Sequence, residues 1–229
     1  MPVTADRSTS RFETDDLAQM TAADRTVLVV VDVQHDFAHV HGAMGRFGLD
    51  LSYAATAIDR IETLIEVARG IGVGIVFARV QSRPETDTRA LRLFMQRSGR
   101  GSDAALAICR HGTTGAGYHR VVPQPGDLQI DKTLFSSFVG TTLDETLRAR
   151  GIDTLVLCGL TTDCCVDCTA RDAFHRDYNV FIVENACAAY DVETHLAAIR
   201  GLSKNVSLMI GTDELVAAWS QAGQSEIAS

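Results

Sequence analysis

The chain has 229 residues, of which 46% are hydrophobic, and it carries a formal net charge of -8 at pH 7. Such a length and composition suffice for one large domain with a substantial core. An acidic balance without a basic patch argues against a nucleic-acid partner. Residues 1–25 lack the apolar core of a signal peptide, and no later segment is apolar for long enough to span a bilayer. We therefore expect a cytoplasmic location without a membrane partner.

Residues 1–25 show little periodicity and are expected to form an arm, mobile or draped over the surface, ahead of a single domain over residues 26–229. In that domain, short apolar segments alternate with segments of helical periodicity. The expected strands are 26–32, 73–80, 128–130, 154–158, 180–183 and 206–210. The expected helices are 52–69, 86–97, 141–150, 166–178 and 192–202, with a terminal helical turn at 214–219. Residues 35–50 and 98–127 are expected to be loops, and the length of the second indicates a functional loop.

This alternation predicts an α/β fold of three layers, in which a central, mostly parallel sheet of about six strands lies between helices. Sites in such sheets lie at the carboxyl ends of the strands. Asp32, Lys132 and Cys165 all fall at or just after these ends, so they are expected to meet at one edge. The G-x-G stretch at 70–74 precedes a strand instead of following one, so it does not indicate a dinucleotide site. No cofactor is expected.

Three of the six cysteines, Cys164, Cys165 and Cys168, lie within five residues of one another. Without an export signal, free thiols are expected rather than disulfides. A structural zinc site is not favoured, because adjacent cysteines on a helix point in different directions and no spaced histidine pair completes a set of four ligands.

The segment around these cysteines changes from strand to helix within a few residues. Gly159 permits a sharp turn, and Cys164 and Cys165 would lie in the first turn of the helix that follows. Unpaired N–H groups and the positive end of the helix dipole favour a thiolate there, which lowers the pKa of the thiol and makes it a nucleophile.

A nucleophilic thiol needs a base and a group that stabilises the oxyanion. Asp32 can act as the base, and the ammonium of Lys132 can keep it ionised despite burial. The backbone N–H groups of Cys165 and of Thr161 in the preceding turn would form the oxyanion hole.

Three motifs together resemble the isochorismatase-like cysteine hydrolases, a family with a Rossmann-like fold that includes nicotinamidases and N-carbamoylsarcosine, ureidoacrylate and biuret hydrolases. The motifs are VDVQHDF at 31–37, Lys132 after a short strand, and GLTTDCCVDCTARDA at 159–173. The resemblance extends from about Thr26 to Ile210. It implies a triad of Asp32, Lys132 and Cys165, with Cys165 as nucleophile rather than Cys164, and a cis peptide bond between Leu160 and Thr161.

The resemblance also implies an amidohydrolase that cleaves a linear amide or ureido C–N bond of a small molecule through a Cys thioester and releases ammonia or an amine. A homo-oligomer, dimer or tetramer, is expected. Three alternatives remain: a nicotinamidase-like hydrolase, an isochorismatase-type vinyl-ether hydrolase, and a non-enzymatic thiol redox sensor on the same scaffold.

Nicotinamidases of this family resemble one another in a metal site made of an Asp-x-His pair and a further His. Here His39 and His41 follow the first motif, but the acidic partner and the later His are missing. A metal-free site is therefore expected. The expected pocket residues are Gln34, Phe37, Arg79 and Phe138. Gln34 and Asp36 would fix the loop, Phe37 would form a wall, and Arg79 would bind a substrate carboxylate or carbonyl.

Overall fold

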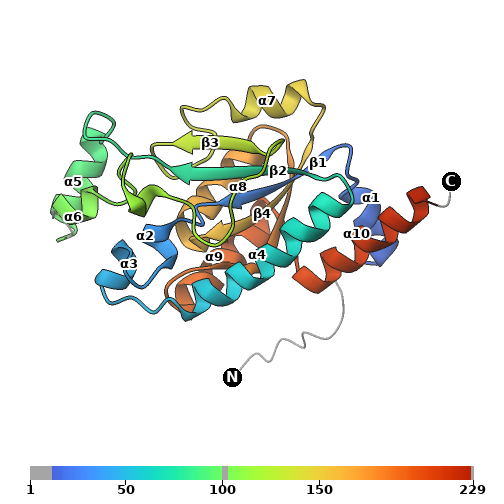
Figure 1. Ribbon diagram of the computed structural model, residues 1–229, viewed down its shortest axis with the longest axis horizontal. Helices are drawn as coiled ribbons and strands as arrows, with labels where there is room; N and C mark the ends of the chain where they lie inside the picture. Colours follow the sequence, from blue (N-terminus) through green and yellow to red (C-terminus); the bar gives the residue numbers. More distant parts are fainter. Residues whose placement is uncertain (1–11, 100–102, 228–229) are drawn as a thin grey trace.

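The computed structural model describes residues 12–99 and 103–227, and its centre is one parallel sheet of six strands in the order β3-β2-β1-β4-β5-β6 (Figure 1). The strands are β1 (Thr26–Val31), β2 (Gly74–Val80), β3 (Leu128–Lys132), β4 (Thr154–Leu160), β5 (Asn179–Ala188) and β6 (Leu208–Ile210). Helices cover both faces, so the expected α/β fold of three layers is confirmed.

Each face of the sheet has its own set of helices. One face carries α1 (Thr14–Met20), α4 (Ser52–Gly70) and α10 (Thr212–Ile227), and the other carries α7 (Leu143–Ala149), α8 (Asp167–Phe174) and α9 (Val192–Asn205). The remaining short elements are α2 (His35–Ala38), α3 (Ala43–Arg46), α5 (Arg89–Arg97), α6 (Asp103–Leu106), the 3-10 turn η1 (Thr114–Ala116) and the π-helical turn η2 (Thr162–Val166). Figure 1 places α5 and α6 at one end of the molecule and α1 and α10 at the other.

The central strand β1 shows why an uninterrupted apolar segment predicts this architecture. All six of its residues are buried. Successive side chains of a strand point to opposite faces, so Leu28 and Val30 join the core beneath α4 and α10, while Val27, Val29 and Val31 join the core beneath α7 to α9. A strand covered on both sides has no polar face.

The N-terminal segment differs from the expected arm. Helix α1 packs against α10 through Leu17, which is 1% exposed, and the indole of Trp219 donates hydrogen bonds to the carbonyl and the hydroxyl oxygen of Thr21. Residues 12–25 therefore belong to the packed body, and the expected turn at 214–219 is part of the longer helix α10. One buried leucine was too little to give α1 a visible apolar period. The remainder of the expected arm, residues 1–11, lies outside the described residues.

The two predicted loops contain short elements of their own: α2 and α3 lie within residues 35–50, and α6 and η1 lie within residues 98–127. None of the described helices combines the length and the apolar character needed to cross a membrane.

The order of the strands creates a switch point in the sheet. From β1 the chain adds β2 and β3 on one side, and β4, which lies on the other side of β1, is followed outward by β5 and β6. The connections after β1 and β4 therefore leave the sheet in opposite directions, and the gap between them at the carboxyl edge is where parallel sheets bind ligands.

Candidate active site

Asp32 directly follows β1 at this switch point and is fully buried. Its N–H donates to the carbonyl of Ala78 in β2 at 2.8 Å, which continues the sheet by one more hydrogen bond. Its φ of 50° lies in the left-handed region, which Asp tolerates better than most residues. The chain thus turns away from the sheet at the residue that bears the carboxylate.

Lys132, the last residue of β3, reaches this carboxylate across the end of β2. Its Nζ lies 2.7 Å from Oδ2 of Asp32 and 3.0 Å from the carbonyl oxygen of Leu134, and both charged side chains are completely buried. Neighbouring strands are about 4.8 Å apart, so only a long side chain can span the strand between them. The structure therefore brings together the two residues that the sequence placed 100 positions apart.

Cys165 is reached from β4 through a short turn. The peptide bond between Leu160 and Thr161 is cis, and the π-helical turn η2 follows at once and runs into α8. Cys165 lies in this turn and is 5% exposed. The expected strand, turn and helix are present, with a π-helical turn in place of the first α-helical turn.

Gly159 allows β4 to approach β1 beside this turn. Its φ is 126°, and a Cβ atom there would clash with the carbonyl oxygen of Val31, the residue before Asp32. Only glycine can occupy such a position without moving the backbone. The close approach places the turn that carries Cys165 next to the end of β1.

The buried ion pair has opposing effects on the pKa values of its members. Burial raises the pKa of Asp32, while the charge of Lys132 and the neighbouring Cys165 thiol act in the opposite direction without cancelling it. Burial alone would lower the pKa of Lys132, but the negative charge of the Asp32 carboxylate outweighs burial and raises it. Lys132 therefore stays protonated at neutral pH.

The two adjacent thiols also influence each other. A hydrogen bond with Cys164, burial and the negative charge of Asp32 raise the pKa of Cys165 well above its usual value. The hydrogen bond with Cys165 lowers the pKa of Cys164. The lowered Cys165 pKa expected at a helix start is therefore not found, because the hydrogen bond with Cys164, burial and the charge of Asp32 all raise it. Cys165 therefore rests as a neutral thiol.

The two carboxylate oxygens of Asp32 differ in their surroundings. Its Oδ1 atom is buried and has no hydrogen-bond partner within ordinary geometry among the described residues, whereas Oδ2 is paired with Lys132. An unpaired carboxylate oxygen in the interior is costly and can accept a proton.

Of the two expected oxyanion donors, Thr161 is the N-cap of the η2 turn and Cys165 lies within it. The carbonyl of Thr161 accepts the N–H groups of Cys164 and Val166, both at 3.1 Å, and these bonds close the turn around Cys165. The role of the Thr161 and Cys165 N–H groups toward an oxyanion stays a prediction.

Gln34 and Phe37 line the adjoining loop. The side-chain amide of Gln34 accepts the N–H of Val80 at 2.8 Å and donates to the carbonyls of Val80 and Ala116, both at 2.9 Å. Through these bonds the Gln34 side chain fixes the loop to the end of β2 and to η1. Phe37 is half-buried and packs against Val80, Cys109 and Ala116.

The structure does not bring Arg79 and Phe138 to this site. Arg79 pairs with Asp131 and lies over the ring of Tyr118, on the sheet face opposite to that of Lys132, because it pairs in register with the residue before Lys132. Phe138 packs in the core against Tyr178, with ring centroids 5.8 Å apart, and Tyr178 precedes the amino end of β5. Register and side-chain direction, which decide both positions, were not readable from the sequence.

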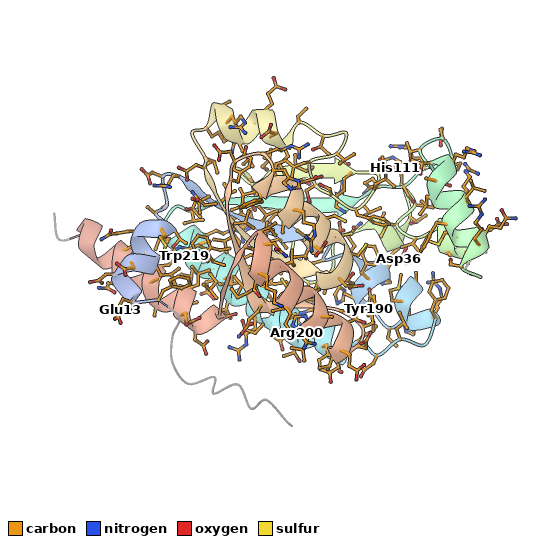
Figure 2. The ribbon with its side chains drawn as sticks, turned by 180° about the vertical axis from the view of Figure 1, so that it is seen from behind. Glu13, Asp36, His111, Tyr190, Arg200 and Trp219 are labelled. Atoms are coloured by element: carbon orange, nitrogen blue, oxygen red, sulfur yellow. The ribbon has the colours of Figure 1, made fainter. Side chains whose placement is uncertain are left out.

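Asp36 and Tyr190 also shape this end of the molecule, opposite Trp219 (Figure 2). The buried carboxylate of Asp36 accepts the N–H groups of Ala43 at 2.9 Å and Cys109 at 2.7 Å, which ties the two long loops together. The hydroxyl of Tyr190 donates to the carbonyl of Phe37 at 3.0 Å. Burial raises the pKa of Tyr190, so the phenol stays neutral. No periodic pattern in the sequence pointed to Tyr190.

Four histidine rings gather beside Asp36. The ring centroids of His35 and His39 are 4.3 Å apart in a stacked arrangement, and the His39 centroid lies 5.3 Å from that of His41 and 5.5 Å from that of His119. Burial and the neighbouring imidazoles lower the pKa values of His35 and His119. In the part of the chain that the structure describes, no three His, Cys, Asp or Glu side chains are arranged to hold a metal ion. A metal-free site stays a prediction.

Comparison with known proteins gives this geometry a context. Residues 26–214 match the family model described as the isochorismatase domain. The chain is 32% identical over 225 residues to the ureidoacrylate amidohydrolase RutB of Methylorubrum extorquens, in an alignment that covers 89% of this chain and 85% of that protein.

Two solved structures show the same fold. The cysteine hydrolase from Pseudomonas syringae pv. phaseolicola has a TM-score of 0.78 at 24% identity, over 95% of this chain and 99% of that chain. The N-carbamoylsarcosine amidase from Thermoplasma acidophilum has a TM-score of 0.66 at 29% identity, over 82% of this chain and 97% of that chain.

Proposed function

The chain belongs to the isochorismatase family, and we propose that it is an amidohydrolase that cleaves a C–N bond of a small linear amide or ureido compound. Its relatives support this class, because one is named ureidoacrylate amidohydrolase and another N-carbamoylsarcosine amidase. The observation that carries the proposal is the buried ion pair of Asp32 and Lys132 beside the Cys165 thiol. Desolvation makes a buried ion pair a poor source of stability, so its presence favours a functional role, and this pair lies where an acid-base group would act on a nucleophile.

The first half of the proposed reaction forms a covalent intermediate. The carboxylate of Asp32 takes the proton of the Cys165 thiol, and the sulfur attacks the substrate carbonyl carbon. The carbonyl electron pair moves to oxygen, where the Thr161 and Cys165 N–H groups donate hydrogen bonds. When this oxyanion collapses, the C–N bond breaks and the departing nitrogen takes the proton back from Asp32. Ammonia or an amine leaves, and a thioester or thiocarbamate remains on the sulfur.

The second half repeats the same proton transfers with water. Asp32 takes a proton from water, the resulting hydroxide attacks the carbonyl carbon, and the C–S bond breaks as the sulfur recovers the proton from Asp32. The product is a carboxylic acid from an amide or a carbamic acid from a ureido compound. Throughout, Lys132 holds the carboxyl of Asp32 in place and compensates its negative charge.

A screen of ammonia release tests this proposal. The panel contains ureidoacrylate, N-carbamoyl amino acids, biuret, maleamate and nicotinamide, and Cys165→Ala serves as the control. We expect turnover of at least one linear ureido or amide compound and none by Cys165→Ala. Turnover by Cys165→Ala equal to that of the wild type would refute the proposed nucleophile, and turnover of nicotinamide alone would favour the nicotinamidase-like alternative.

A thiol redox sensor is a second candidate, and Cys164 is the observation in its favour. Cys164 is half-buried, and the hydrogen bond from Cys165 lowers its pKa, as expected for a thiol that reacts with peroxide. This candidate predicts no turnover of any compound in the panel and a reversible, peroxide-dependent loss of free thiols. A redox-sensor function does not explain why Asp32 and Lys132 form a buried ion pair beside these thiols.

A further inference from the structure

Thr162 connects the η2 turn, which carries Cys165, to helix α9. It is fully buried, and its Oγ1 atom lies 2.9 Å from Nδ1 of His195. Thr162 follows Thr161 directly and precedes Cys165 by three residues. The contact therefore enters the turn that carries both proposed oxyanion donors.

The conformation and the N-cap of this turn are both unusual. Its geometry is π-helical, and isolated π turns are rare and concentrate at functional sites. Thr161 occupies the N-cap position and makes no side-chain capping bond. A hydrogen bond from a neighbouring helix can therefore decide where the N–H groups of this turn point.

Helix α9 is a suitable anchor for the turn. Its first turn is fixed by the carboxylate of Asp191, which accepts the N–H of Thr194 at 2.8 Å. Further along, Ile199 and Leu202 are buried in the same apolar cluster as Cys165. His195 thus extends from a helix whose position is set at both ends, as a group that orients a reactive site should.

We propose that His195 is a positioning residue, which acts through Thr162 to hold the Thr161 and Cys165 N–H groups where the oxyanion develops. The proposal rests on the proposed function of the site. A neutral Nδ1 atom can accept the Thr162 hydroxyl proton and a protonated Nδ1–H can donate to Oγ1, so the contact survives in either state. Because the donors act on charge that appears only in the transition state, their displacement lowers kcat more than it raises KM.

Paired substitutions separate the hydrogen bond from the shape of the side chains. Thr162→Val and His195→Leu remove the bond, while Thr162→Ser keeps the hydroxyl and His195→Asn keeps a polar atom near the position of Nδ1. Arg200→Gln, an exposed position on the same helix (Figure 2), is the matched control. We expect Thr162→Val and His195→Leu to lower kcat roughly tenfold to a hundredfold with KM within about twofold of wild type. Thr162→Ser and His195→Asn should retain most of the wild-type kcat.

The double variant Thr162→Val/His195→Leu gives an independent check. Because both substitutions remove one contact, its kcat should be no lower than that of the worse single variant. If the fold-loss of kcat in the double variant equals the product of the two single losses, the proposal is overturned.

The hydrogen-exchange rates of the amides in residues 161–166 measure how firmly His195 holds the η2 turn, and they need no substrate. We expect faster exchange in Thr162→Val and His195→Leu, and wild-type exchange in His195→Asn and Arg200→Gln. Unchanged exchange, or a kcat of the folded Leu and Val variants within twofold of wild type, would overturn the proposal. If the wild-type protein releases no ammonia from any compound, the proposed function fails as a whole, and the exchange data alone decide whether His195 anchors the turn.

Discussion

Lys132 and Asp32 form an ion pair with an Nζ–Oδ2 distance of 2.7 Å across the end of β2, the strand that separates their own strands. Neither side chain is exposed. The pair therefore links β3 to β1 at the point where the proposed nucleophile enters the sheet edge.

Lys132→Met removes the positive charge and keeps the length of the side chain. The carboxyl of Asp32 is then buried without a cation, its pKa rises further, and it holds its proton at neutral pH. We expect kcat to fall by about 10²- to 10⁴-fold, the range of a lost general base. The free energy of unfolding should fall by about 3–5 kcal/mol at pH 8. Because protonation of Asp32 removes the unpaired charge, this deficit should shrink as the pH is lowered.

Lys204→Met is the matched control, since Lys204 is exposed. Urea unfolding and steady-state kinetics should show wild-type values. A Lys132→Met variant as active as Lys204→Met would contradict the role of the ion pair.

The pH dependence of kcat/KM reports the ionisation of Asp32. Burial raises its pKa above the ordinary value of 3.8, with Lys132 and Cys165 opposing this effect. Below its folded-state pKa the carboxyl is protonated and cannot take the thiol proton, so activity falls with falling pH. We expect the midpoint of this acidic limb to lie above 3.8. A rate profile that stays flat down to about pH 4 in a folded protein would show that another group is the base.

Gly159→Ala tests the close approach of β4 to β1. The added Cβ would clash with the Val31 carbonyl oxygen and would force a side chain into a φ of 126°. Overpacking against backbone and left-handed strain together should cost about 3 kcal/mol or more of unfolding free energy. Gly70→Ala is the control, because no atom lies within 4 Å of its added Cβ and Gly70 ends helix α4. It should be neutral or stabilise by up to about 1 kcal/mol. Equal urea midpoints for the two variants would contradict this account of Gly159.

Chelation tests the expectation of a metal-free site. After exhaustive dialysis against a chelator, the protein should keep its full rate of ammonia release, because the proposed steps use only Asp32, Lys132, Cys165 and backbone N–H groups. Loss of activity that returns on addition of Zn²⁺ or Mn²⁺ would contradict the expectation and would direct attention to His39 and His41.

The positions of Asp32 and Lys132 could be inferred from the sequence because each stands where an apolar strand ends. A parallel sheet brings such ends to one edge whatever the details of packing. The side chain of Arg79 could not be placed in this way. Its face depends on the register between β2 and β3, and a slip of one residue reverses every side chain of a strand.

Contacts between helices and turns could not be predicted from the sequence for a different reason. The bond between Thr162 and His195 depends on how α9 is rotated on the sheet, which core packing decides. The clustering of His119 with His39 depends on the path of a long loop that has no period of its own. Helix α1 was not predicted because Leu17 is its only fully buried residue, which is too little for a visible apolar period.

Intact-mass spectrometry of the acid-quenched reaction tests the central claim most directly, namely that Cys165 is the nucleophile. With a turned-over amide or ureido substrate, the wild type and Cys164→Ala should both carry one acyl or carbamoyl adduct, which peptide mapping locates at residue 165. Cys165→Ala should carry no adduct and release no ammonia. An adduct on Cys164, or turnover by folded Cys165→Ala at the wild-type rate, would contradict the account.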